Sequence, residues 1–195
     1  MPLSVLKRDP VSSFRAAISG NVELVVDAQH FQKIVLEGIL KAEVSIDVMT
    51  ADFKAMLVPD RVTKRARSIV QVFRQLANRG VEIRLLHAGV PSSAALRDLK
   101  RKLPTRLTIR RCPRLHAKAI VIDARRMYLG SANLTGAGLG AKADGRRNFE
   151  MGVCTESSGL IDAVLEQFNS LWEGHRCEDC RRHDICPQPL EEPQL

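Results

Sequence analysis

Residues 115–135, LHAKAIVIDARRMYLGSANLT, combine an apolar run with several polar residues that could act on a substrate. The apolar run in this stretch predicts a strand over 115–122, and a second strand is predicted over 127–130. Because side chains alternate across a strand, His116 and Lys118 fall on the same face. An imidazole and an ammonium group therefore point to one spot, at the end of a strand whose remainder is buried.

Two neutral hydrogen-bond donors follow in the same stretch. Ser131 and Asn133 stand in a loop of small residues, Gly-Ser-Ala-Asn. Together with His116 and Lys118, these groups would bind a tetrahedral anion. Imidazole is the one group among them that ordinarily titrates near neutral pH, so His116 is the natural nucleophile or general base.

The spacing of these residues is H-x-K-x4-D-x6-G-S-x-N, which His116, Lys118, Asp123 and residues 130–133 fill at every position. This pattern resembles the signature of the phospholipase D superfamily. The resemblance extends over roughly residues 21–172, in which predicted strands and helices alternate. It implies an α/β sandwich, with a mixed central sheet flanked by helices.

The resemblance also implies a role for each residue of the motif. His116 is expected to attack phosphorus and form a phosphohistidine. Lys118 and Asn133 are expected to bind the phosphate, with assistance from Ser131, and Asp123 is expected to be structural or orienting. No metal is expected in catalysis, because the ammonium and amide groups stabilise the developing charge.

Members of the superfamily also use an acid downstream of the asparagine, which hydrogen-bonds the histidine and fixes its tautomer. Glu150 fits this role best, because we expect it to face away from an apolar set formed by Phe149, Met151 and Val153. Asp144, in a glycine-rich loop, is the alternative.

The number of motif copies predicts a dimer. In-line displacement at phosphorus places the attacking and leaving atoms on opposite sides, so one histidine cannot serve both. The superfamily uses two motif copies, whereas this chain has one. A second His116 is therefore expected from another subunit of a homodimer.

Other parts of the chain predict further strands and helices. The alternation of apolar Val44, Ile46 and Val48 with polar neighbours predicts a half-buried strand. Further strands are expected at 22–27, 81–85, 106–111 and 149–153, and helices at 28–41, 62–79, about 92–102 and 161–171. The expected organisation is an N-terminal arm (1–20), a catalytic domain (21–172) and a Cys-rich tail (173–195).

Positive charge is concentrated in one segment. The chain has a net charge of +8, yet residues 61–126 hold 18 Lys and Arg against 3 Asp and Glu, a net +15. A polyanionic partner is the simplest reason for such a concentration, and an ordinary solvated basic face is the alternative that charge alone leaves open. The expected nucleic-acid-binding residues are Lys64, Arg65, Arg67, Arg101, Arg111 and Arg114.

The superfamily includes phospholipases, phospholipid synthases and nucleases, so the motif alone does not select a substrate. The basic segment, the single motif and the lack of an amphipathic or aromatic-rich membrane-binding stretch favour a nuclease, with DNA favoured over RNA. The 8 aromatic residues are not interleaved with the basic runs, which favours phosphate contacts and cleavage largely independent of base sequence. The alternatives are a phospholipid phosphodiesterase or phosphatidyltransferase, and a non-catalytic nucleic-acid-binding subunit.

Two features of the sequence bear on the cellular setting. No stretch approaches the ~20 apolar residues of a membrane span, and the first twenty residues do not resemble a signal peptide. We therefore expect a cytoplasmic protein. By analogy with stand-alone relatives, it could belong to a bacterial restriction or phage-defence complex.

The tail predicts a metal site. Its sequence HRCEDCRRHDIC (175–186) contains the pair Cys-x2-Cys and a third cysteine six residues later. Three thiolates and one imidazole suit tetrahedral, structural zinc, and an iron–sulfur cluster is the less favoured alternative. An all-cysteine site would need Cys154 or Cys112 from the main domain. The expected ligands are Cys177, Cys180, Cys186 and either His183 or His175.

Overall fold

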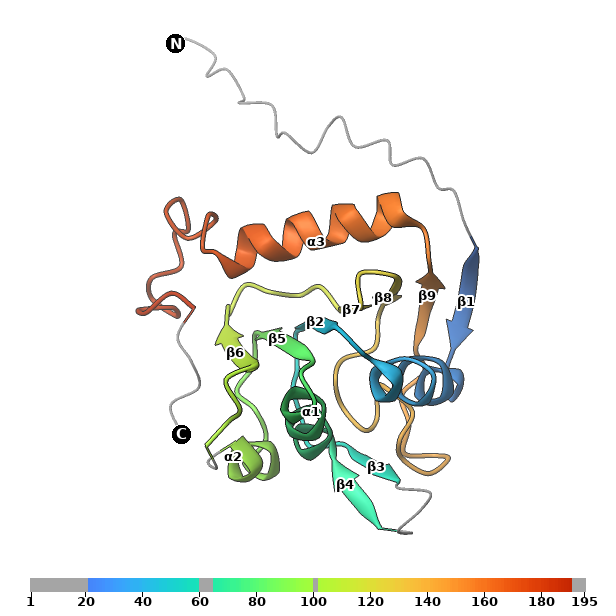
Figure 1. The fold of residues 1–195 in the computed structure, drawn as a ribbon. Helices are drawn as coiled ribbons and strands as arrows, with labels where there is room; N and C mark the ends of the chain where they lie inside the picture. The colour runs from blue at the N-terminus through green and yellow to red at the C-terminus, as the bar shows by residue number, and fades with distance from the viewer. Residues whose placement is uncertain (1–20, 60–64, 100–101, 191–195) are drawn as a thin grey trace.

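A seven-stranded sheet forms the centre of the molecule (Figure 1). The computed structural model describes residues 21–59, 65–99 and 102–190, so the expected N-terminal arm lies outside the described residues. The strand order is β1-β9-β8-β7-β2-β5-β6. The strands are β1 (Val22–Val26), β2 (Ser45–Thr50), β5 (Glu82–His87), β6 (Leu107–Arg111), β7 (Ala119–Ile122), β8 (Arg126–Gly130) and β9 (Met151–Thr155).

The sheet is mixed, as expected from the sequence. β2, β5 and β6 are parallel to one another, whereas β2–β7, β7–β8, β8–β9 and β9–β1 are antiparallel pairs. Consequently, the ends of β2 and β8 and the beginnings of β7 and β9 all lie at the same edge of the sheet. This edge carries the motif.

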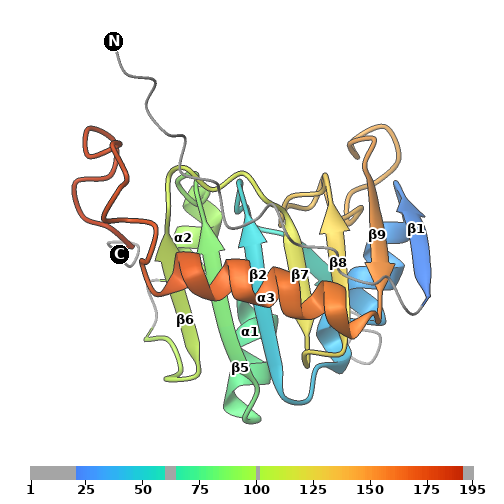
Figure 2. The same cartoon turned by 90° about the horizontal axis from the view of Figure 1, so that it is seen from above.

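Helices cover both faces. α3 (Ser158–Trp172) lies on one face and crosses it from β9 towards β6 (Figure 2). The opposite face is covered by α1, α2 and a helical segment after β1 (Figure 1). No helix of the described ranges is long and apolar enough to span a bilayer. The remaining elements are α1 (Ile69–Asn78), α2 (Ser93–Leu99), the π-helical η2 (Phe31–Leu36), the 3₁₀ turn η3 (Ile39–Lys41) and a hairpin of β3 (Leu57–Pro59) and β4 (Ala66–Ser68).

β2 is more deeply buried than the sequence predicts. All residues from Ile46 to Thr50 are buried, although the alternating pattern indicated one solvent-facing side. The reason is that α3 covers that side. Asp47 there accepts a hydrogen bond from Arg84 Nε at 2.6 Å, and the Arg84 guanidinium lies 4.7 Å from the centre of the Phe168 ring in α3.

The helix predicted over 62–79 is shorter, because it begins at Ile69. Ser68 and Gln71 form a capping box: the Ser68 hydroxyl accepts the Gln71 N–H at 3.2 Å, and the Gln71 side chain accepts the Ser68 N–H. The predicted end is confirmed, since Gly80 follows the helix with a φ of +104°.

The helix predicted over 28–41 is divided into η2 and η3, and Gly38 lies at the division. A β-carbon at Gly38 would lie 2.5 Å from the Ile34 carbonyl oxygen and 2.7 Å from the Ile122 side chain. The chain can approach β7 this closely because residue 38 is glycine.

The strand predicted over 115–122 begins only at Ala119. His116 and Lys118 therefore lie in the irregular segment before β7, and strand alternation is not what brings them together.

The apolar set from which Glu150 is expected to face away lies on the outer side of the sheet, at and just before the start of β9. Phe149 is 97% exposed and Met151 is 61% exposed, whereas Gly152 and Cys154 are buried. The inward face of β9 lies against Tyr128, and the two glycines Gly130 and Gly152 leave room for its ring.

Candidate active site

The motif residues gather where β7 and β9 begin and β2 and β8 end. The Gly130 N–H at the end of β8 donates to the Lys118 carbonyl at 3.1 Å, and the Ser131 N–H donates to the Met151 carbonyl at 3.0 Å. These backbone bonds hold the segment with His116 beside the Gly-Ser-Ala-Asn loop. The topology thus brings together residues that are up to 34 positions apart in the sequence.

His116 and Lys118 form the reactive pair of the site. The Lys118 Nζ atom lies 3.2 Å from each ring nitrogen of His116 and donates to the His116 carbonyl at 2.8 Å. The imidazole is exposed and Lys118 is half-buried. A nucleophile and a cation are therefore presented to solvent side by side.

Ser131 and Glu150 form a second pair. The Ser131 hydroxyl donates to the Glu150 carboxylate at 2.5 Å and accepts the Met151 N–H at 3.0 Å. Asn148 donates to the other carboxylate oxygen at 3.0 Å. Among the described residues, no hydrogen bond joins Glu150 to His116, so the expected contact with the histidine is not formed in this structure.

Asp27 fixes the backbone of Glu150. Its carboxylate accepts the Glu150 N–H at 3.0 Å, and its own N–H donates to the Glu150 carbonyl at 2.9 Å. Asp27 adopts a φ of +44° directly after β1, which an aspartate tolerates better than most residues. The edge strand therefore holds Glu150 at the site.

Asn133 is oriented by residues at the end of β2. Its side-chain oxygen accepts the Asp52 N–H at 3.0 Å and lies 3.3 Å from the Thr50 hydroxyl. Thr50 is buried, donates to the Asp52 carbonyl at 2.7 Å and accepts the Leu134 N–H at 2.9 Å. Because the amide oxygen is engaged, the amide nitrogen is directed elsewhere and can donate to a phosphate.

A buried chain of hydrogen bonds supports the loop from below. The Tyr128 hydroxyl accepts the Ala132 N–H at 3.1 Å and lies 3.0 Å from His30 Nε2. Nδ1 of His30 lies 2.9 Å from the Asp27 carbonyl, which can only accept, so Nδ1 is the donor and Nε2 accepts from Tyr128. Burial raises the pKa of Tyr128 to about 12, so the hydroxyl keeps its proton at neutral pH.

Removal of this hydroxyl is expected to loosen the loop. In Tyr128→Phe, the buried Ala132 N–H and His30 Nε2 each lose a partner, which should reduce the free energy of unfolding by about 1–3 kcal/mol. Urea denaturation measures the change. Thr105→Val, which removes an exposed hydroxyl from a turn, is the control and should change stability by less than about 0.5 kcal/mol. Equal stability of Tyr128→Phe and the wild type would show that this hydroxyl does not support the loop.

Asp123 lies at the opposite end of β7 from His116. Its carboxylate accepts the backbone N–H groups of Glu43, Val44 and Ser45, at distances of 2.7 to 3.2 Å. It ties the turn between β7 and β8 to the start of β2, and this is a structural contact.

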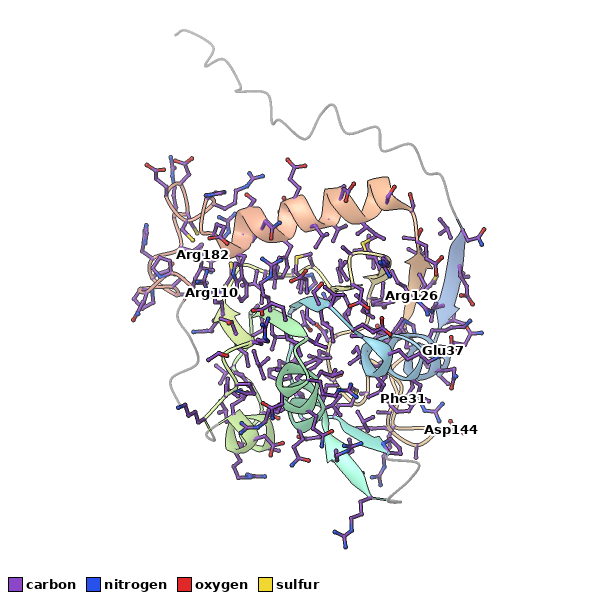
Figure 3. The ribbon with its side chains drawn as sticks, viewed as in Figure 1. Phe31, Glu37, Arg110, Arg126, Asp144 and Arg182 are labelled. Carbon is purple, nitrogen blue, oxygen red and sulfur yellow. The ribbon has the colours of Figure 1, made fainter. Side chains whose placement is uncertain are left out.

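Asp144, the alternative acid, lies away from the motif. Its carboxylate is 93% exposed and pairs with Arg147 at 2.7 Å. Figure 3 shows Asp144 at the edge of the molecule. None of its described contacts links it to His116 or Ser131.

The expected nucleic-acid-binding residues that the structure describes lie in two regions, Arg111 and Arg114 at the end of β6 and Arg65 and Arg67 at β4. Arg111 ends β6, and Arg114 lies in the loop that leads to His116. Arg67 contacts Gln75 and lines a surface cavity with Arg126, which begins β8 at the end opposite the site. Arg65 precedes β4, and Lys64 and Arg101 lie outside the described residues.

The tail ligands do not form a closed site. Residues 173–190 contain turns without a helix or strand, and His175 and His183 are exposed. Within the described part of the chain, no three His, Cys, Asp or Glu side chains are arranged to hold a metal ion.

The supporting residues were not predicted from the sequence. Thr50, His30 and Tyr128 belong to no motif, and they lie between 4 and 102 positions from Ala132 in the loop that they support. A polar residue at the end of a buried strand, as Thr50 is, was the one available signal.

Comparison with known proteins identifies the fold and the family. A mixed sheet with this motif at one edge is the architecture of phospholipase D-like phosphodiesterases. The family profile described as "Cardiolipin synthase, PLD-like domain" matches residues 35–172. The chain belongs to this phospholipase D-like family. No curated protein sequence matched the chain.

Solved structures of low sequence identity share the fold. Nuc from Salmonella typhimurium, described as a phospholipase D family member, is 22% identical with a TM-score of 0.60, over 80% of this chain and 95% of Nuc. NucT from Helicobacter pylori is 16% identical with a TM-score of 0.60, over 80% of this chain and 97% of NucT. Phosphatidylserine synthase from Haemophilus influenzae is 15% identical with a TM-score of 0.53, over 76% and 38% of the two chains.

Proposed function

We propose that this protein is a metal-independent nuclease, which cleaves phosphodiesters largely without regard to base sequence and favours DNA over RNA. The observation that supports it best is the exposed pair of His116 and Lys118, which a backbone hydrogen bond from Gly130 to Lys118 holds next to the loop that carries Asn133. The pair supplies a nucleophile and a cation, and the amide supplies a neutral donor. Together they provide charge stabilisation for a phosphoryl group.

The reaction proceeds in two displacements. A ring nitrogen of His116 attacks phosphorus, forming a P–N bond while the P–O bond on the opposite side breaks. The leaving oxygen takes a proton from a second imidazole. Water then attacks the phosphohistidine with that imidazole as base, the P–N bond breaks, and both histidines are restored.

The second imidazole comes from another copy of the chain. His30 and His87 are fully buried, and the other two histidines, His175 and His183, lie in the tail. A two-fold axis beside the His116 segment would bring two such segments to one cleft. The proposed enzyme is therefore a homodimer with a composite site.

An exposed apolar sheet face next to the site supports this dimer. Leu24, Val153 and Leu129 lie in register across β1, β9 and β8, on the face that α3 covers only in part (Figure 2). Leu129 directly precedes Gly130 and Ser131. The exposed apolar residues of this face are Val22, Leu24, Val26, Leu129 and Met151. A patch of this kind marks an interaction surface, and its position beside the motif suits a second copy.

The dimer should dissociate when this face is charged. Leu24→Glu is expected to give particles of the 21.7 kDa chain mass by light scattering, whereas the wild type should give about twice that mass. Leu57→Glu is the matched control, because Leu57 is 60% exposed, as Leu24 is 59% exposed, but belongs to β3. A dimeric and active Leu24→Glu variant would show that the subunits meet elsewhere.

Arg114 is expected to contact phosphate. Affinity for a DNA duplex should fall with salt, with a log–log slope of about −0.9 per phosphate contacted, and Arg114→Gln should make that slope shallower by about one unit. Arg106→Gln is the control, since Arg106 precedes β6 at its other end and pairs with Glu82. Fluorescence anisotropy at several salt concentrations measures both slopes. Equal slopes for Arg114→Gln and the wild type would remove Arg114 from the interface.

The substrate is tested with one panel. Purified protein is incubated in EDTA with labelled DNA, labelled RNA and phospholipid vesicles. The proposal predicts cleavage of nucleic acid, with DNA cleaved faster than RNA and vesicles left intact. Turnover of phospholipid without inhibition by DNA would assign a lipid phosphodiesterase instead. Tight, salt-sensitive DNA binding without cleavage would assign a non-catalytic subunit.

A further inference from the structure

Phe149, directly before Glu150, is the one exposed aromatic residue among those that the structure describes. It is 97% exposed, whereas every other described aromatic residue is buried or half-buried. Burial of a phenyl ring stabilises a fold, so a fully exposed ring gives up a contribution that the other rings make. Because Phe149 adds so little to the core, its ring is available to a ligand.

The backbone on both sides of Phe149 is held by hydrogen bonds. The Asn148 N–H donates to the Ala137 carbonyl at 3.2 Å, and the Asp27 N–H donates to the Glu150 carbonyl at 2.9 Å. The Glu150 N–H donates in turn to the Asp27 carboxylate at 3.0 Å. The ring is therefore presented from a fixed position, which lowers the entropy cost of binding a ligand against it.

This position adjoins the active site. Glu150, the next residue, accepts the hydrogen bond from Ser131 of the motif, and the Met151 carbonyl accepts the Ser131 N–H at 3.0 Å. Figure 2 shows the glycine-rich loop (residues 136–148) at the edge of the sheet where β9 begins and β8 ends. Phe149 therefore stands beside the site, where a nucleotide next to the scissile phosphate can reach it.

The residues before Phe149 favour a polyanion as the ligand. Arg146 is exposed, and no carboxylate of the described residues pairs with it, since Asp144 pairs with Arg147. Two copies of this loop would place like charges together, which disfavours a subunit contact. A membrane surface binds several apolar side chains, whereas the exposed residues from 142 to 148 are polar, charged or small. A nucleic acid fits both groups, with a phosphate for Arg146 and a base for Phe149.

We propose that Phe149 is a stacking platform for an unpaired base next to the scissile phosphate, an inference that rests on the proposed nuclease function. In a duplex, the neighbouring base pairs cover both faces of each base, so the ring can stack only on an unpaired or terminal base. The protein should therefore prefer single-stranded to double-stranded DNA. The preference is independent of base identity, because every base has a flat π face.

A strand without bases isolates the contribution of stacking. Fluorescence anisotropy compares a short single-stranded oligonucleotide, an abasic strand of the same length and a duplex. The wild type should bind the abasic strand roughly 5- to 150-fold more weakly than the normal strand, as expected for the loss of one base–aromatic stack. Phe149→Ala should bind both strands alike, and it should bind the duplex as the wild type does.

Two further variants separate stacking from a general apolar contact. Phe149→Trp should retain the preference for the normal strand, whereas Phe149→Leu, which is apolar but has no ring, should lose it. Val44→Ala is the matched control, because Val44 is 62% exposed and lies at the end of the sheet opposite the site. The melting temperature of Phe149→Ala should equal that of the wild type, since the ring is exposed.

Several results would overturn the platform. Equal affinity of the wild type for normal and abasic strands, or a retained preference in Phe149→Leu, would exclude stacking. A particle mass of Phe149→Ala below that of the wild type would place the ring in a subunit contact. Loss of vesicle binding in Phe149→Ala, with DNA binding unchanged, would assign the ring to a lipid surface.

The proposed function can fail separately from this inference. DNA cleavage and strand binding that do not depend on Phe149 would overturn the platform alone. Turnover of phospholipid vesicles without cleavage of nucleic acid would overturn the nuclease function on which the platform rests.

Discussion

Replacement of His116 by alanine is expected to abolish phosphodiester cleavage, with a loss of at least about 10⁴-fold in kcat. The imidazole is both the proposed nucleophile and, from the second subunit, the proposed acid. His30 and His87 are buried in the fold and cannot replace it. Initial rates on labelled DNA in EDTA measure the loss.

The fold of this variant should be intact, because His116 is exposed and precedes the strand. Its melting temperature and circular dichroism should match those of the wild type. His175→Ala changes another exposed histidine, in the tail, and should leave the rate unchanged. Full activity of a folded His116→Ala protein would end the proposed mechanism.

The second large effect is expected at the phosphate ligands. Lys118→Ala and Asn133→Ala should each reduce kcat by about 10²–10³, as the loss of one charge-stabilising donor does. Lys142→Ala removes an exposed lysine of the glycine-rich loop and is the control. Rates at saturating substrate separate the effect on kcat from an effect on KM.

Thr50 provides a finer test of the Asn133 assignment. Thr50→Val removes the hydroxyl that contacts the Asn133 oxygen and the Leu134 N–H, so kcat should fall while DNA binding persists. Thr50→Ser retains the hydroxyl and should restore the rate.

If Asn133→Ala raised KM and left kcat unchanged, the amide would bind the ground state and not the transition state.

The sequence predicts most elements of the sheet, because each strand has its own apolar pattern. It does not predict which face of a strand is covered. The alternation correctly identifies Met151 and Val153 as residues on one face of β9, whereas Phe149 precedes the strand. That face points outward, because the strand lies beside the edge strand β1, beyond most of α3.

β2 shows the opposite case, a strand side that is buried although its polar pattern indicates exposure. Its polar residues indicated a solvent-facing side, but a helix that comes over 110 residues later covers it, and Asp47 is buried with Arg84 as its partner. Such burial depends on tertiary packing, which no local pattern reports.

The site could be predicted only where a motif marks it. The spacing from His116 to Asn133 identifies the reactive groups, whereas the residues that orient them are single polar side chains on other elements: Thr50 on β2, Tyr128 on β8 and His30 before η2. Thr50, His30 and Tyr128 became apparent because the fold places their hydrogen bonds under one loop. Glu150 is held by Ser131 and Asp27; the motif includes Ser131 but predicts neither its hydrogen bond to Glu150 nor the contribution of Asp27.

The covalent intermediate tests the central proposal most directly. Wild-type protein is mixed with DNA in EDTA, quenched in alkali to preserve phosphohistidine, digested and analysed by peptide mass spectrometry. The mechanism predicts a nucleotide phosphate on His116 that forms and decays during turnover. Cleavage without such an adduct, or an adduct on another residue, would contradict it.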